Sequence, residues 1–124
     1  MNVNEKIKTA LSEIVNGNIY ALAKPADENP DVFITYNSQG DYSDRGDNRD
    51  LEWEHDMQIH WYAKGIADYT ESRKQIREAL RNAGFFITGN PLNIYETENG
   101  QSGNGTQTGY THVVITCIID EEDD

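Results

Sequence analysis

Two strand-like runs constrain the fold of this chain more than any other feature. In residues 57–64, apolar side chains at odd positions alternate with polar or large ones at even positions, a period of two that places one face on a core. Residues 32–36 are rich in β-branched and aromatic side chains, with Phe33 and Thr35 on the face opposite Val32, Ile34 and Tyr36. The two runs predict strands of one sheet, joined by an acidic loop over residues 39–50.

Helical spacing marks two other segments. Residues 3–15 predict an amphipathic helix that stops at Asn16-Gly17, and residues 68–83 predict a second that stops at Gly84. The apolar stripes that carry these predictions are Val3, Ile7, Ala10, Leu11 and Ile14 in the first segment, and Tyr69, Ile76, Ala79, Leu80 and Ala83 in the second.

Three further runs complete the predicted sheet. Residues 19–23 form a short extended run before a proline-containing loop at 24–31, and residues 85–96 form a strand interrupted at Gly89-Asn90-Pro91. Residues 110–119 form a long final strand that pairs back as a hairpin. This order predicts a single domain, residues 1–124, of α+β class: a two-layer, mostly antiparallel sheet of four to five strands with two helices packed on one face.

The charge of the chain limits its partners. Twenty-two acidic and ten basic residues give a formal charge of −12, which argues against tight binding of nucleic acid through a basic surface. Residues 120–124 are all acidic and predict a disordered end. No run approaches the roughly 18 apolar residues of a membrane span, and no apolar signal core is present, so we expect a soluble protein. Cys117 is the single cysteine, so no disulfide can form within the chain. Its place in an apolar strand pattern predicts a small core residue.

Two features favour contacts with other proteins. Five of the ten basic residues gather around the second helix, and this region is suited to an acidic partner surface; they are Lys64, Arg73, Lys74, Arg77 and Arg81. The final strand is apolar on both faces, because Val114 and Ile118 lie opposite the apolar odd positions. Its second face therefore also needs a partner.

Motifs that would carry chemistry are weak. His55 and His60 point to opposite faces of a strand, and although His112 would join His60 across neighbouring strands, no third metal ligand is identifiable. The 41–50 loop lacks the calcium-loop spacing, the glycines of 100–109 do not form a phosphate cradle, and Cys117 is expected to be buried. We therefore predict no cofactor, no metal and no enzymatic activity.

Four stretches together resemble the tail-terminator, or tail-completion, proteins of long-tailed bacteriophages: residues 32–37, 57–64, 72–86 and 110–119. The resemblance implies a virion protein of a phage or prophage that forms a ring, usually of six copies, on the head-proximal end of the tail tube. Such a ring stops tube elongation and joins the tail to the head connector protein. DNA would pass through its lumen without specific binding, and assembly would take place in the host cytoplasm.

In such a ring, the arm at 41–50 and the hairpin tip at 100–109 would meet neighbouring subunits or the tube, and the basic helix suits the same role. The predicted subunit or tube interface is Asp41, Tyr42, Asp44, Arg45, Asp47, Arg49, Asp50, Arg73, Arg77 and Arg81. Two alternatives stay open: another phage neck or minor capsid component, and a small acidic immunity-type protein that neutralises a basic target. A metal-dependent enzyme ranks last.

Overall fold

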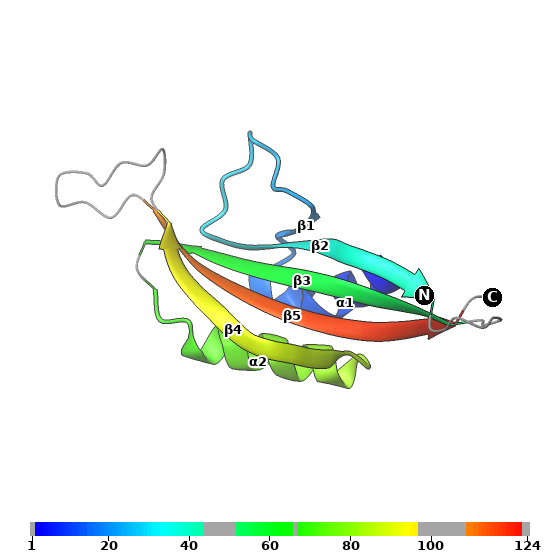
Figure 1. Ribbon diagram of the computed structural model, residues 1–124. Coiled ribbons are helices and arrows are strands. Elements are labelled where there is room, and N and C mark those ends of the chain that lie inside the picture. Colours follow the sequence, from blue (N-terminus) through cyan, green and yellow to red (C-terminus); the bar gives the residue numbers. More distant parts are fainter. Residues whose placement is uncertain (1, 44–51, 66, 97–108, 123–124) are drawn as a thin grey trace.

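A computed structural model of the protein describes residues 2–43, 52–65, 67–96 and 109–122. It contains one five-stranded sheet in the order β1-β2-β3-β5-β4, with both helices on the same face (Figure 1). The two-layer α+β prediction is confirmed. The elements are α1 (Val3–Leu11), a 3-10 turn (Ser12–Val15), β1 (Ile19–Ala21), β2 (Val32–Ser43), β3 (Glu52–Lys64), α2 (Thr70–Asn82), β4 (Phe86–Glu96) and β5 (Tyr110–Glu122).

Local signals define the ends of the helices. At the start of α1 the Glu5 amide donates to the Asn2 side chain at 2.8 Å, and the Asn2 amide donates to the Glu5 carboxylate at 3.0 Å. This capping box satisfies amides that have no partner within the helix. The predicted stop is also confirmed, because Asn16 and Gly17 both adopt positive φ angles, 55° and 85°. Among the described residues, no helix is long and apolar enough to cross a membrane.

The strand ladder is antiparallel except at one edge. β2 pairs with β3, β3 with β5, and β5 with β4, all antiparallel, whereas the short β1 runs parallel to β2. The predicted interruption in β4 is confirmed as a register shift between Thr88 and Leu92. A second shift, between Ser38 and Gly40 in β2, was not predicted. Such bulges bend and twist a strand, and together they allow long strands to curve over the helices.

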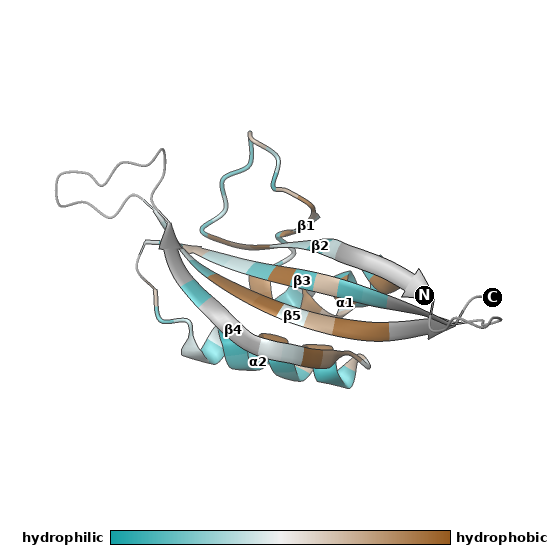
Figure 2. Cartoon of the chain, viewed as in Figure 1, coloured by the Kyte–Doolittle hydropathy of each residue, from teal (hydrophilic) through white to brown (hydrophobic). Residues whose placement is uncertain are grey.

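The core lies between the sheet and the helices. The odd positions of β3 and β5 face it, as the alternation predicted, and apolar segments of the strands and helices meet there (Figure 2). Trp61, Ile76 and Leu80 are buried, with 3% of Trp61 exposed and none of the other two. The core cluster also includes Val3, Ile7, Leu11, Val15, Ile34, Tyr36, Met57, Ile59, Phe85, Val113, Ile115, Cys117 and Ile119.

Three strands extend beyond their predicted ends. β2 continues to Ser43 and β3 begins at Glu52, so Asp41 and Tyr42 lie in a strand, and the prediction of a loop from residue 39 was wrong. β5 continues to Glu122, so the prediction of a disordered acidic end from residue 120 was also wrong for residues 120–122. In each case a neighbouring strand supplies backbone hydrogen-bond partners that polar side chains do not prevent. Residues 123–124 lie outside the described part.

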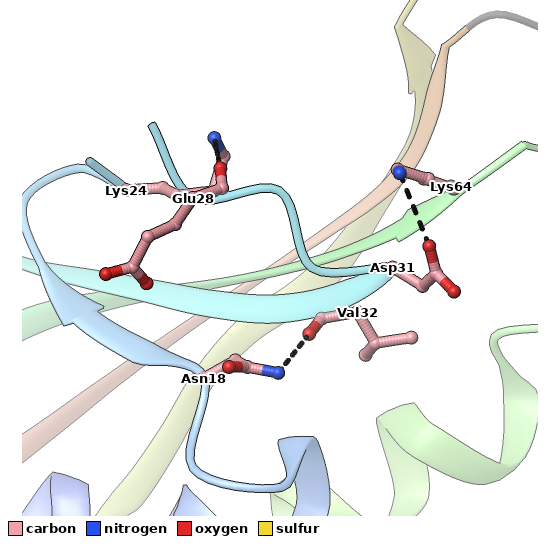
Figure 3. Close-up of polar contacts among 6 residues, drawn as sticks. All are labelled: Asn18, Lys24, Glu28, Asp31, Val32 and Lys64. Atoms are coloured by element: carbon pink, nitrogen blue, oxygen red, sulfur yellow. Dashed lines mark hydrogen bonds and ion pairs between the residues drawn. The ribbon is translucent and has the colours of Figure 1, made fainter. Parts of the chain in front are cut away.

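Polar contacts lie within the connection between β1 and β2 and at its two ends (Figure 3). Asn18 donates a side-chain hydrogen bond to the Val32 carbonyl at 3.4 Å, and the Lys24 ammonium donates to the Glu28 carbonyl at 2.6 Å. At the end of β3, Lys64 forms an ion pair with Asp31 at 3.3 Å. Lys64, one of the five basic residues that the sequence grouped together, therefore has a carboxylate partner just before β2.

Candidate interaction surface

The strongest candidate site is a basic stripe along α2. Arg73, Arg77 and Arg81 recur four positions apart, and Lys74 lies three positions before Arg77, so the four residues gather on one side of the helix. We call these four residues the basic helix face. With Thr70 and Glu78 they line an open groove of about 300 Å³. The three arginines predicted as interface residues are therefore brought together, with Lys74, which the sequence had also grouped around this helix.

Burial of the opposite side of α2 orients this face. Ile76 and Leu80 are fully buried against the sheet, and the Phe85 amide donates to the Leu80 carbonyl at 2.9 Å where the chain turns into β4. An amphipathic helix held by such residues must present its polar side outward. The basic helix face is thus fixed on a rigid element of the fold.

The first residue of the stripe also has contacts of its own. The Arg73 guanidinium lies 5.2 Å from the centroid of the Tyr69 ring, within the range of a cation–π contact. One of its nitrogens approaches the Asn93 side-chain oxygen on β4 at 3.5 Å. Because Asn93 belongs to β4, the edge strand of the sheet, the basic helix face lies on the side of α2 near that edge.

Within the described residues, the cations of this face have no ion-pair partner. In the part of the chain that the structure describes, none of the four forms an ion pair, and the Arg77 Nε atom is buried without a hydrogen-bond partner. Four cations and one carboxylate, that of Glu78, line the groove, and this excess of positive charge favours an acidic partner.

The other predicted interface residues divide into two groups. Asp41 and Tyr42 belong to the β2 backbone, opposite His55 and Glu54 of β3. Asp44, Arg45, Asp47, Arg49 and Asp50 lie outside the described residues, as does the predicted hairpin tip from residue 100 to 108. The described structure therefore brings Arg73, Arg77 and Arg81 together on α2 and places the backbone of Asp41 and Tyr42 in β2.

A second surface feature lies on the sheet face opposite the helices. The Tyr62 ring stacks between Phe33, at 4.7 Å between centroids, and His112, at 4.2 Å. His60 Nδ1 and His112 Nε2 are 2.8 Å apart, and His60 Nε2 lies 3.1 Å from the Gln58 side-chain oxygen. The predicted meeting of His60 and His112 is confirmed, as a hydrogen-bonded pair within an aromatic stack.

The remaining candidates for chemistry are weak. No group of three or more metal-ligating side chains occurs among the described residues. Cys117 is fully buried, and desolvation, with a contribution from the charge of Asp56, raises the pKa of its thiol to about 12. A thiol with that pKa is not a nucleophile at neutral pH.

The fold and this surface together define a class: a small acidic α+β protein with a rigid basic face suited to protein contacts. Comparison with family models gives a more specific result. The chain belongs to the family described as tail completion protein gp17, whose model matches residues 6–119. No curated protein matches the chain significantly. Membership makes this protein a phage tail-completion protein, a virion tail component with a role in tail assembly.

Proposed function

We propose that this protein caps the head-proximal end of the tail tube, stops tube elongation and joins the tail to the head connector. It acts as a ring, for which we propose six copies, without catalysing a reaction. The family match supports a role in tail assembly. The observation that supports the assembly mode is the basic helix face, a cluster of four cations on a chain whose net charge is −12.

The ring would use two kinds of surface. The basic helix face, with Arg73, Arg77 and Arg81, contacts acidic groups of a neighbouring subunit or of the tube. The arm that begins with Asp41 and Tyr42 and continues through Asp44, Arg45, Asp47, Arg49 and Asp50 supplies further contacts. The net charge of −12 suits a lumen that DNA crosses without adhering, because phosphate and carboxylate groups repel one another.

Tube growth in vitro tests this function. Purified tail tube protein from the same virion is polymerised with and without the chain, and tube lengths and end structures are recorded by negative-stain electron microscopy. We expect rings at one end of each tube and no further extension of that end when fresh tube protein is added. Light scattering of the chain alone gives its absolute mass.

The control is the same tube protein with heat-denatured chain. Continued elongation at both ends in the presence of native protein would refute the capping role. Binding to the head connector with no effect on tube length would indicate another neck component. A strict monomer that ignores tubes and captures a basic protein would support the immunity-type alternative.

A further inference from the structure

We infer that neighbouring copies in the ring meet edge to edge, with Leu22 of one copy packed on Phe86 of the next. This contact rests on the ring proposed above and specifies the surfaces that build it. β1 and β4 are the two edge strands of the sheet (Figure 1). Leu22 directly follows β1, and Phe86 is the first residue of β4, so each copy uses one edge toward each of its neighbours.

Exposure singles out these two residues. Among the described residues they are the large hydrophobic side chains that lie open to solvent, with 76% of Leu22 and 68% of Phe86 exposed. Single exposed hydrophobic side chains are common on protein surfaces, so exposure alone carries little weight. Their placement adds to it, because one stands at each edge of the sheet and a head-to-tail contact brings the two together.

The backbone presents Leu22 at a conformational cost. The Ala23 amide donates to the Ala21 carbonyl at 2.8 Å, which closes a three-residue turn, and Leu22 at its centre has a φ of 72°. This form of turn is rare and strained, and a bulky residue is an outlier there. The Leu22 amide donates to the Tyr36 carbonyl at 2.8 Å, which fixes the turn to β2. Glycine fits this backbone better, and a contact with another copy gives a reason for leucine.

The receiving edge is apolar. Phe86 pairs with Ile118 on β5, and Ile118 is partly exposed. Cys117 and Ile119, which flank Ile118 along β5, belong to the core, so Ile118 and its partner Phe86 lie on the sheet face opposite the helices. The sequence predicted that this second face of β5 needs a partner. The Leu22 side chain suits the patch in both size and chemistry.

The charges beside the two apolar groups favour a second copy as the partner. The basic helix face lies near the β4 edge, and α2 as a whole has four basic and two acidic residues, a net charge of +2. The connection that begins at Leu22, residues 22–31, has one basic and three acidic residues, a net charge of −2, and its Asp27 and Glu28 are exposed. Contact between opposite edges therefore brings opposite charges near each other, whereas contact between like edges opposes like charges.

The difference between the two edges decides the symmetry. A contact between unlike surfaces is head-to-tail, so it generates a ring if the rotation closes and a filament if it does not. A two-fold dimer cannot use it, because that symmetry joins identical patches.

Thiol crosslinking tests the contact directly. We expect Leu22→Cys with Phe86→Cys to give a ladder of covalent oligomers with a short bis-maleimide, because each copy then links to both neighbours. Each single variant should stay monomeric on a denaturing gel. The native Cys117 is fully buried and does not take part. The matched control is Leu22→Cys with Lys8→Cys, which places the second thiol at an exposed position of α1 and should give no ladder.

Substitutions separate the contact from the fold. Leu22→Asp and Phe86→Asp should each raise the concentration for half-assembly about tenfold or more, because a buried apolar contact is lost and a carboxylate is left there without a partner. Leu22→Gly suits the positive φ, so it should leave Tm unchanged or higher while weakening assembly to the same extent. Light scattering and counts of capped tube ends measure assembly, and circular dichroism confirms that every variant is folded.

Rings that persist in both aspartate variants, or a double cysteine variant that assembles but gives no ladder, would overturn this contact. A ladder or dimers from a single cysteine variant would indicate that like edges meet, and would overturn it as well. Each of these results leaves the capping function intact if the wild-type chain still stops tube growth. A wild-type chain that forms no ring, free or on tubes, would instead overturn both proposals.

Discussion

Truncation of Trp61 measures how much the inner face of β3 contributes to stability. Trp61 is 3% exposed and sits in the middle of the sheet, paired with Ile34 on β2 and Val113 on β5, both buried. Removing a buried Trp side chain costs about 3–5 kcal/mol, from lost transfer free energy and the cavity left behind. Since a domain of this size has roughly 5–15 kcal/mol of stability, we expect Trp61→Ala to lower Tm by roughly 12–20 °C.

Trp61→Phe separates packing from hydrogen bonding at the same position. The indole nitrogen is buried and has no hydrogen-bond partner among the described residues. An unsatisfied buried donor costs about 1–3 kcal/mol, so its removal offsets much of the loss from the smaller ring. We expect Trp61→Phe to change the free energy of unfolding by no more than about 1 kcal/mol, far less than the alanine variant.

Urea unfolding followed by circular dichroism provides both values, with unchanged m values as the check on two-state behaviour. The matched control is Leu22→Ala, because Leu22 is 76% exposed and its truncation should have little effect. An unchanged Tm in Trp61→Ala would refute the core placement. If Trp61→Phe were as destabilising as Trp61→Ala, the argument from an unsatisfied indole would be wrong.

Three other predictions concern single groups. Burial raises the pKa of the Cys117 thiol to about 12, so above about pH 9 the native state binds more protons than the unfolded state. The free energy of unfolding should therefore fall from about pH 9 to 12. Urea unfolding of the wild-type chain and of Cys117→Ala measures this, and the same pH profile in both would contradict it. In a double-mutant cycle with alanine, the free energies of unfolding should give a coupling energy of about 0.5–1.5 kcal/mol between His60 and His112. If the two single substitutions were simply additive, the 2.8 Å contact would contribute nothing to stability. Gly84 has a φ of 100°, which strains any residue with a Cβ atom. Gly84→Ala should therefore lower the stability of the fold by about 1–2 kcal/mol in thermal unfolding. An unchanged Tm would mean that the helix end relaxes to a different backbone conformation.

Features carried by local spacing were predictable. The alternation in residues 57–64 identified the inner face of β3, and the Gly-Pro interruption at 89–91 marked the register shift in β4. The spacing of Arg73, Arg77 and Arg81 likewise predicted one charged side of a helix, because positions three and four apart are neighbours on any α-helix.

Features that depend on a neighbouring strand were not predictable in the same way. Residues 39–43 and 120–122 are polar, and they are strands because β3 lies beside them and pairs with their backbone. The ion pair of Lys64 depends on where the 22–31 connection places Asp31. The sequence suggested that His60 and His112 share a sheet face, but only the β3–β5 register shows that their ring nitrogens meet.

By itself, the sequence determined the class of fold, the inner faces of the central strands, the acidic charge and the basic side of α2, since these follow from the periods of strand and helix and from composition. The tertiary structure decided the strand order, the parallel β1, the histidine pair and the full length of the β3–β5 ladder. The physical reason is that register and strand order join residues far apart in the chain, and a backbone ladder forms wherever a partner strand lies alongside, whatever the local pattern of side chains.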